Sequence, residues 1–482
     1  MLYLTETELA EAKQMAEQNQ SKSKFLEWIL QQHAMGEKKQ RMQEGQRYFL
    51  CEHDILRRDF RQKEVSETKD GKEELKKFYN PNRSNHKNVN PFHHTLVMQK
   101  AAYLVGREPT VTIKGHNEMF EKEITDFCGE TFNRLLYRWV VEASNSGVSY
   151  LHIYYDTDGD IAMDFVPAEE LIVFYDEKKR TEMTDVIRYY DRSVWELGKR
   201  QTRRCVEWWT KEDVTYFQEN KNGGFVEEQK TPHWIVTKAE DGEEVERIAH
   251  NWGRVPFIAL QNNAEETTDL EPIKGLIDAY DLLSSEGTNN LLDLVELYWV
   301  LQGYGGEAAN TVTKKLQINK AVHISDSSGH IEAKQVELPM ESRMAWLKLL
   351  RKDIFHFGMG VDTDSENWGK APSGIALQFQ YAMFYLKVNG MMPEIRSAMK
   401  QMFRFLVEHW NRCDGGNRNW KDIQITLNTS GITDEWQTVQ MIQASKGLVS
   451  EKTLLGKHPF VEDVNFEMEQ LYLERKENVE QV

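Results

Sequence analysis

The spacing of apolar positions changes several times along the chain, and each change predicts a different element. The first fifty residues are rich in Glu, Gln, Lys and Ala, with Leu26, Ile29 and Leu30 at helical spacing. This segment predicts surface helices. The stretch from Lys63 to Asn88 is polar and charged, so we expect it to contain a loop.

Two helices with buried faces are predicted next. From Asn90 to Gly106, apolar residues recur at steps of three and four after Pro91, a residue suited to a first helical turn. A second helical run spans Asn117 to Ser146 and ends at Gly147, after which the period changes.

Between Ser149 and Asn263, short β-branched and aromatic runs such as SYLHIYY and LIVFY alternate with turn signals. The clusters DTDGD (Asp156 to Asp160) and NKNGG (Asn220 to Gly224) are typical of hairpin turns. The first is a poor calcium loop, because its glycine is fourth rather than sixth and no Glu closes the loop. We therefore expect an antiparallel β-rich lobe.

Helical spacing returns after Thr268. The sequence TDLE (Thr268 to Glu271) predicts a capping box, and the helix that it opens is expected to run to about Gly303. Apolar residues line one side of this helix, and polar residues recur at steps of three and four on the other. The polar residues are Asp278, Asp281, Ser285, Asn289, Asp293 and Glu296. We interpret them as a solvated, acidic face.

The following third of the chain alternates between helices and connections. Residues Tyr304 to Leu338 predict a small inserted module with strands, and Met340 to Phe357 predict another helix. Gly358 to Gly374 are dense in Gly, Asp, Ser and Asn, which predicts a loop. A long helix from Ile375 to Trp410 should be kinked at Pro393, and one strand, two short helices and a charged helical tail complete the chain.

Composition narrows the possible functions. The chain has 60 Lys and Arg against 77 Asp and Glu, a net charge of −17. This charge argues against tight binding of nucleic acid, although DNA could still pass the protein. There is no run of eighteen apolar residues and no signal-peptide pattern, so we expect a cytoplasmic product. The four cysteines form no C-x-x-C pair and are interpreted as reduced, structural thiols.

The sequence also lacks the common catalytic motifs, with no P-loop, no G-x-S-x-G and no H-E-x-x-H. His93 and His94 are adjacent, so on a helix they point in different directions and are poorly placed to share a metal ion. Trp208 and Trp209 could stack on bases, but neighbours in a strand alternate faces, so at least one is expected in the core. We predict no cofactor, no metal and no enzymatic activity.

The order of these parts resembles that of siphophage portal proteins, the head–tail connectors of tailed bacteriophages. The acidic-faced helix, inserted module, second helix, Gly/Asp-rich loop and long helix are similar to the family's stem, clip, second stem helix, tunnel loop and spanning helix. Strings similar to the family's sequences follow in the family's order. They are NPFHHTLVMQKAAYLVGREPTVT (Asn90 to Thr112), SNSGVSYLHIYYDTDGDI (Ser144 to Ile161), GRVPFIALQNN (Gly253 to Asn263), LEPIKGLIDAYD (Leu270 to Asp281), SGIALQFQ (Ser373 to Gln380) and GLVSEKTLLGKHPFVED (Gly447 to Asp463).

The resemblance implies an α+β portal fold with an α/β wing, long stem helices, a small inserted clip module, a long kinked spanning helix and a helical C-terminal crown. The expected parts are the wing at 1–267 (N-terminal helices, then the β-rich lobe), stem helix 1 at 268–303, the clip at 304–338, stem helix 2 at 339–357, the tunnel loop at 358–374, the long kinked helix and return strand of the wing at 375–432, and the crown at 433–482.

The resemblance also implies a structural role in the virion. Portal subunits form a dodecameric ring at one capsid vertex, and its channel passes double-stranded DNA during packaging and ejection. The implied partners are further copies of the chain, the terminase large subunit, a head–tail adaptor, and the major capsid and scaffolding proteins, with no membrane. Before assembly, we expect the subunit in the host cytoplasm.

Two sets of channel residues follow from the resemblance. The stem would line the channel with Asp278, Asp281, Asn289, Asp293 and Glu296, and the tunnel loop would present Asp362, Asp364, Glu366, Asn367, Trp368 and Lys370. The hinges would be Gly358, Gly360, Gly369, Gly374 and Pro393. An acidic lining repels phosphates, so the duplex would slide through instead of binding.

Two other classes of function stay open. A DNA-processing phage enzyme, such as a metal-dependent nuclease, would need a clustered metal site, which we cannot assemble from this sequence. A generic structural protein of the capsid is the other alternative, and the order of stem, loop and long helix argues against it.

Overall fold

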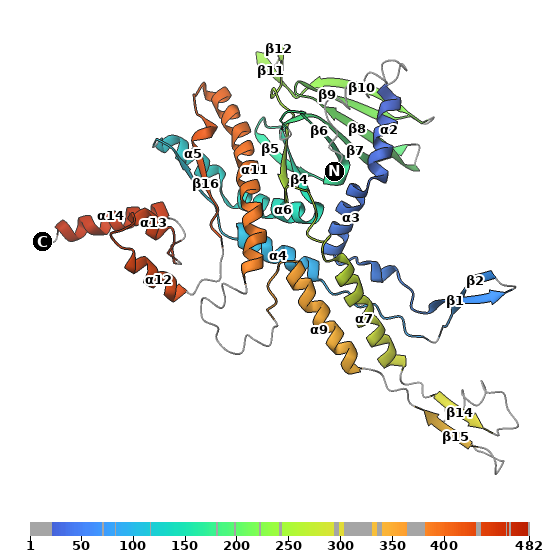
Figure 1. Ribbon diagram of the computed structural model, residues 1–482. Coiled ribbons are helices and arrows are strands. Elements are labelled where there is room, and N and C mark those ends of the chain that lie inside the picture. Colours follow the sequence, from blue (N-terminus) through green and yellow to red (C-terminus); the bar gives the residue numbers. More distant parts are fainter. Residues whose placement is uncertain are drawn as a thin grey trace.

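The protein is built of helices and antiparallel sheets, which confirms the α+β class. The computed structural model describes residues 22–69, 72–81, 83–115, 117–179, 182–196, 199–220, 223–240, 243–293, 298–302, 330–334, 340–363, 381–429, 435–458, 460–461 and 464–480. Figure 1 shows a body of sheets and helices from which two helices, α7 (Lys274–Asp293) and α9 (Met340–Phe357), project side by side. We call these two helices the stem pair.

The N-terminal segment is helical, as its spacing predicts. Helix α2 (Lys22–Met35) buries Leu26, Ile29 and Leu30 in an apolar cluster with the largest sheet. Helix α3 (Glu37–Phe49) follows directly, and η1 (Asp54–Arg57) comes after it. These helices therefore contribute to the core as well as to the surface.

The stretch predicted to contain a loop has irregular backbone at 83–90, as expected, but its first part forms a β-hairpin that was not predicted. Strands β1 (Gln62–Lys69) and β2 (Lys72–Tyr79) pair antiparallel along their whole length. Apolar alternation is weak in these strands, and the hairpin projects from the body (Figure 1), so the period-two signal of a half-buried strand is missing. The sequence does carry a signal for it, because Asp70-Gly71 is a favoured two-residue hairpin turn.

The helix predicted from Asn90 is confirmed as α4 (Phe92–Val105). The second predicted helix is divided into α5 (Glu118–Phe127) and α6 (Glu130–Ser146). Its predicted end is confirmed, because Gly147 has a φ of 78° and an added Cβ would lie 2.2 Å from the carbonyl oxygen of Glu266. A left-handed, crowded position of this kind requires glycine.

The predicted antiparallel β lobe is confirmed, as two sheets and a hairpin. The sheets have the strand orders β13–β4–β5 and β10–β9–β8–β7–β6, and β11 pairs with β12. The strands are β4 (Val148–Tyr155), β5 (Ile161–Val166), β6 (Leu171–Tyr175), β7 (Met183–Glu196), β8 (Lys199–Trp209), β9 (Asp213–Glu219), β10 (Phe225–Pro232), β11 (Trp234–Glu240), β12 (Glu243–His250) and β13 (Phe257–Gln261). The two predicted turn clusters connect β4 to β5 and β9 to β10.

Trp208 and Trp209 of β8 are both buried, which confirms the prediction for at least one of them. They belong to different apolar clusters, Trp208 to that of α2 and Trp209 to one with β4 and β13. Each indole N–H donates to a carboxylate, at 2.8 Å from Trp208 to Asp185 and at 3.0 Å from Trp209 to Glu207. Base stacking is therefore not their role.

The predicted capping box precedes α7. The N–H of Thr268 donates to Glu271 Oε1 (2.9 Å), and the N–H of Glu271 donates to Thr268 Oγ1 (3.3 Å). The predicted extension of this helix to Gly303 is wrong, because β14 (Tyr298–Gln302) pairs antiparallel with β15 (His330–Lys334) at the far end of the stem pair (Figure 1). Helix α9 has the predicted bounds, whereas most of the inserted module lies outside the described residues.

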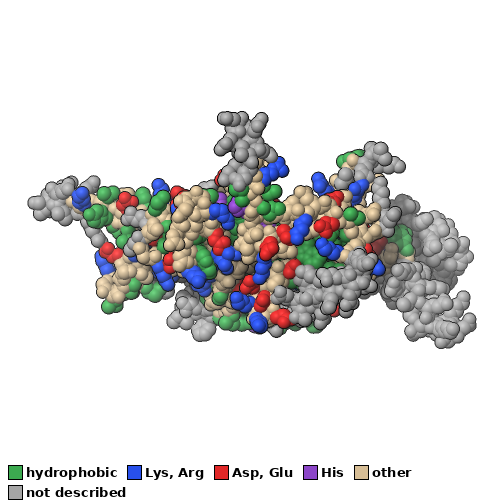
Figure 2. Space-filling model, turned by 90° about the horizontal axis from the view of Figure 1, so that it is seen from above, with side chains coloured by type: hydrophobic (Ala, Val, Ile, Leu, Met, Phe, Trp, Pro, Cys, Tyr) green, Lys and Arg blue, Asp and Glu red, His purple; other side chains and the backbone are tan. Residues whose placement is uncertain are grey.

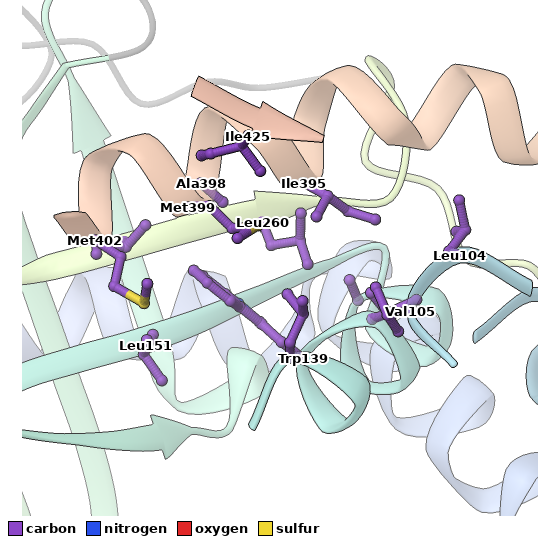
Figure 3. Packing of buried hydrophobic residues seen from close by; sticks show 14 of the residues in the cluster. Leu104, Val105, Trp139, Leu151, Leu260, Ile395, Ala398, Met399, Met402 and Ile425 are labelled. Atoms are coloured by element: carbon purple, nitrogen blue, oxygen red, sulfur yellow. The ribbon is translucent and has the colours of Figure 1, made fainter. Parts of the chain in front are cut away.

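The main core lies between α11 (Ala382–Asp414), α4, α6 and the three-stranded sheet. Figure 3 shows Trp139 of α6, Leu260 of β13 and Met399 of α11 meeting in this core. Helix α11 continues through Pro393, and the predicted kink there stays a prediction. The predicted last strand is confirmed as β16 (Ile423–Thr426), which pairs with β3 (Thr110–Ile113).

The C-terminal region is helical, as predicted, with α12 (Glu435–Ala444), α13 (Glu451–Leu455) and α14 (Val464–Glu480). These helices lie to one side of the body (Figure 1). Lys and Arg side chains are interspersed with Asp and Glu on the face seen in Figure 2. All four cysteines are free thiols, and within the described ranges no helix has the length and apolarity to cross a membrane.

Candidate functional site: the stem helices and the base of the loop

The polar face of α7 binds the backbone of another segment, residues 83–90, which we call the strap. Backbone N–H groups of alternate strap residues donate to α7 side chains that are one helical turn apart. The four bonds run from Ser84 to Asp293 Oδ1 (2.9 Å), from His86 to Asn289 Oδ1 (2.7 Å), from Asn88 to Ser285 Oγ (2.9 Å) and from Asn90 to Asp281 Oδ1 (2.9 Å). The strap and α7 therefore run antiparallel, joined by a ladder of polar bonds.

The spacing of this ladder follows from backbone geometry. Four helical residues advance about 6 Å along an axis, and two extended residues advance about 6.6 Å. An extended strap therefore presents an amide to each turn of α7. Among the described residues no strand pairs with the strap, and its amides bind side-chain acceptors instead.

The interpretation of this face as solvated is wrong for Asp281, Ser285 and Asn289, which are 0% exposed. Asp281 and Asn289 are therefore too deeply buried within the subunit to line a channel, and we no longer propose them as channel-lining residues. By contrast, Leu291 and Leu292 near the far end of α7 are exposed. Sequence spacing correctly separated the two faces of α7 but assigned the buried face to solvent.

Asp281 forms a buried ion pair with His53, whose Nδ1 lies 2.5 Å from its Oδ2. The other ring nitrogen of His53 lies 3.3 Å from the carbonyl oxygen of Tyr48. Both ring nitrogens of His53 thus lie within hydrogen-bonding distance of an oxygen atom. The pair joins the segment before η1 to α7, and nothing in the sequence spacing connects residues so far apart.

The remaining predicted stem residues have different surroundings. Asp278 accepts hydrogen bonds from Tyr48 and from Lys274 (2.9 Å), which offsets its charge. Lys274 also donates a hydrogen bond to Asp54 (2.8 Å). Burial acts to raise the pKa of Asp54, but the hydrogen bonds from Lys274 and Arg47 outweigh it and lower this pKa to about 2. Asp293 is half-buried beside the strap, and Glu296 lies outside the described residues.

The start of the predicted tunnel loop is held by three side chains that we call the loop anchor. Gln99 of α4 makes two hydrogen bonds with the backbone of Val361. Its Nε2 donates to the carbonyl oxygen of Val361 (2.8 Å), and its Oε1 accepts from the N–H of Val361 (3.1 Å). Arg351 of α9 binds Asp362 with two hydrogen bonds, at 2.9 and 2.7 Å. Lys387 of α11 donates to the carbonyl oxygen of Gly358 (3.0 Å).

Gly358 and Gly360 were predicted as hinges, and the structure gives them a packing role. A Cβ at Gly360 would lie 1.9 Å from Cδ2 of Leu96, and one at Gly358 would lie 2.7 Å from Cδ1 of the same leucine. Their hinge role stays a prediction. The other predicted loop residues Asp364, Glu366, Asn367, Trp368, Gly369, Lys370 and Gly374 lie outside the described residues.

A buried charge cluster stands behind the loop anchor. Asp269 lies 3.1 Å from Nζ of Lys100 and 3.1 Å from Nζ of Lys387, and Lys100 also donates to Asn262. Burial lowers the pKa of Lys100 to about 8, against the opposing effect of Asp269. Burial alone would raise the pKa of Asp269, but the two ammonium groups hold it below its usual range. Sequence reasoning missed this cluster because its members come from distant segments.

The two adjacent histidines of α4 make polar contacts within the subunit. His93 is buried with Nε2 at 3.0 Å from Asn145 Oδ1, and His94 Nδ1 lies 3.0 Å from the carbonyl oxygen of Phe49. In the part of the chain that the structure describes, no three His, Cys, Asp or Glu side chains are grouped as a metal site.

Comparison with known proteins gives consistent matches over nearly the whole chain. The family model described as "Phage portal protein, SPP1 Gp6-like" matches residues 29–481. The chain is 29% identical over 450 residues to the portal protein of Bacillus phage SPP1, covering 90% of this chain and 84% of that protein. It is 30% identical over 401 residues to the portal protein of Clostridium phage phiCD119, covering 80% of this chain and 84% of that protein.

Proposed function

This chain belongs to the SPP1 Gp6-like family of phage portal proteins, and on that premise we propose that it is one subunit of a dodecameric ring at a single capsid vertex. The channel of the ring passes double-stranded DNA during genome packaging and ejection. The observation that carries this proposal is the family match over residues 29–481, together with the projecting stem pair and its terminal hairpin.

The surface of the stem pair supports assembly with further copies. The polar side of α7 faces the strap, and several apolar side chains of the stem pair are exposed. They include Leu291 and Leu292 of α7 and Met344, Trp346 and Leu349 of α9. A closed ring needs two different complementary patches on each subunit, and exposed apolar side chains of this kind suit such an interface.

For the channel lining, we propose Asp278, Asp293 and Glu296 from the stem, with Asp364, Glu366, Asn367, Trp368 and Lys370 from the tunnel loop. Repeated around a ring, acidic side chains keep phosphates at a distance, and the net charge of −17 acts in the same direction. The duplex then meets a surface that it does not bind.

The partners follow the parts of the chain. In this proposal β14, β15 and the rest of the clip at 304–338 meet the terminase large subunit during packaging and then the head–tail adaptor. The wing meets the major capsid and scaffolding proteins, and the crown at 433–482 faces the capsid interior. The subunit is made in the host cytoplasm and ends in the virion.

The alternative of a DNA-processing enzyme is not favoured. The family is one of structural proteins, and His93 and His94, which we predict to be poorly placed to share a metal ion, each contact another group of the subunit.

Negative-stain electron microscopy of the purified chain tests the proposal. End-on rings of dodecameric symmetry with a stain-filled centre are expected. Compact monomers or dimers at all protein concentrations, with and without scaffolding protein, would contradict it.

A further inference from the structure

We infer that Gln99 is a positioning residue for the base of the tunnel loop: with Arg351 and Lys387 it fixes residues 358–362 to the body. This inference rests on the proposed function, in which the loop faces the channel. The fixed segment contains Gly358 and Gly360, two of the expected hinges.

The side-chain amide of Gln99 binds Val361 in the way that a neighbouring strand would, with one donor and one acceptor. The amide of Gln99 satisfies both the N–H and the carbonyl oxygen of Val361, at 3.1 and 2.8 Å. The side chain of Val361 is buried in the main core. The residue is thus held on its backbone and on its side chain, and displacing it would leave buried polar groups without partners.

The backbone before Val361 carries strain that needs such support. Met359 has a φ of 52°, a conformation that non-glycine residues hold mainly where their surroundings impose it. Gly358 and Gly360 on either side are packed against Leu96. A Cβ at either glycine would collide with Leu96, so the close packing of this segment depends on both glycines.

The other two anchor residues connect the base of the loop to both long helices that flank it. Arg351 ties Asp362 to α9, and Lys387 ties Gly358 to α11 while it also binds Asp269. Arg351 also compensates the charge of Asp362, so this carboxylate is paired within the subunit. The position of the loop base is therefore coupled to the position of α4, α9 and α11 together.

Hydrogen–deuterium exchange on the full chain, read on peptides that cover residues 358–363, tests the anchor. Gln99→Met removes both amide bonds at nearly constant volume, and we expect roughly tenfold faster exchange there. Gln99→Glu keeps the acceptor for the Val361 N–H and loses the donor to its carbonyl oxygen, so a smaller increase is expected. Gln32→Met, on an exposed position of α2, is the matched control and should change nothing.

Rings and packaging are then compared for the same variants. Gln99→Met should form rings and package fewer genomes than the wild type or Gln32→Met, whereas exchange in α11 stays unchanged. Unchanged exchange at 358–363 would overturn the anchor, and faster exchange with full packaging would overturn its role in positioning the loop. A wild-type chain without rings would contradict the proposed function instead, while the exchange data would still decide whether Gln99 holds the loop base.

Discussion

The two longest described helices, α11 and α7, bury opposite kinds of surface. Helix α11 buries Phe384, Met391, Met399 and Phe403 against other apolar side chains. Helix α7 buries Asp281, Ser285 and Asn289 against the backbone of the strap. The difference teaches that the chemistry of the partner decides which face of an amphipathic helix turns inward.

The two surfaces should also respond differently to substitution. Apolar packing gains free energy with buried area and tolerates swaps that conserve volume. A ladder of polar bonds depends on each member, because an unpaired buried amide or carboxylate loses its hydration without replacement. Variants on the two helices can therefore separate these modes of stabilisation.

The largest effect is expected in the apolar core of α11. Phe403→Ala should lower the free energy of unfolding by about 4 kcal/mol, because a fully buried ring leaves a cavity. Urea titration measures the loss. Met383→Ala, on the exposed side of the same helix, should cost less than about 1 kcal/mol, and equal losses would show that α11 does not pack as described.

The next largest effect is expected at the ion pair of α7. Asp281→Leu should cost about 3 kcal/mol, because it leaves His53 and the amide of Asn90 buried without their acceptor. Replacing both His53 and Asp281 by Leu should recover part of that loss, since no lone charge remains. A double variant no more stable than Asp281→Leu would contradict the ion pair; Glu286→Leu on the same helix is the control.

A smaller loss is expected at the next strap contact. Asn289→Leu removes the acceptor for the His86 N–H (2.7 Å) and the donor to its carbonyl oxygen (3.0 Å), so about 2 kcal/mol should be lost. The neighbouring substitution Asn290→Leu, outside the ladder, serves as control. Hydrogen exchange at His86 should rise in the first variant alone, and similar behaviour of both would refute the ladder.

The smallest effect concerns acid stability at the start of α7. The pKa of Asp54 is lowered from 3.8 to about 2 in the folded chain, so its ion pairs stabilise the fold above pH 4 and lose this effect as pH falls toward 2. Asp54→Asn should therefore lose less stability than the wild type between pH 4 and pH 2. Parallel acid titrations by circular dichroism would show the difference, and identical curves would exclude it.

Local signals in the sequence were sufficient for helix ends, whereas contacts between distant segments were not. The capping box at Thr268 and Glu271 and the left-handed Gly147 depend on neighbours within a few residues, so their sequences predict them. The burial of Asp281 depends on His53 and Asn90, which no local pattern connects to α7. The cluster of Lys100, Asp269 and Lys387 was missed for the same reason.

The charged hairpin β1–β2 illustrates a different difficulty. Strand prediction relies on one apolar face, and this segment has few apolar residues, so its turn signal at Asp70-Gly71 was the remaining clue. In the same way, β14 continues the apolar spacing of α7, so that periodicity alone extended the helix past its end.

The strap has a consequence for how this part of the protein can evolve. Side chains of α7 accept hydrogen bonds from backbone N–H groups of the strap. Proline at positions 84, 86, 88 or 90 has no N–H, so it would leave the acceptor on α7 without its hydrogen bond. On α7, drift at 281, 285, 289 and 293 is restricted to residues that accept hydrogen bonds. Selection should therefore conserve hydrogen-bond acceptors at these positions of the helix, but in the strap it should only exclude proline. In a comparison of family sequences, the two sides of one contact would thus show different patterns of conservation.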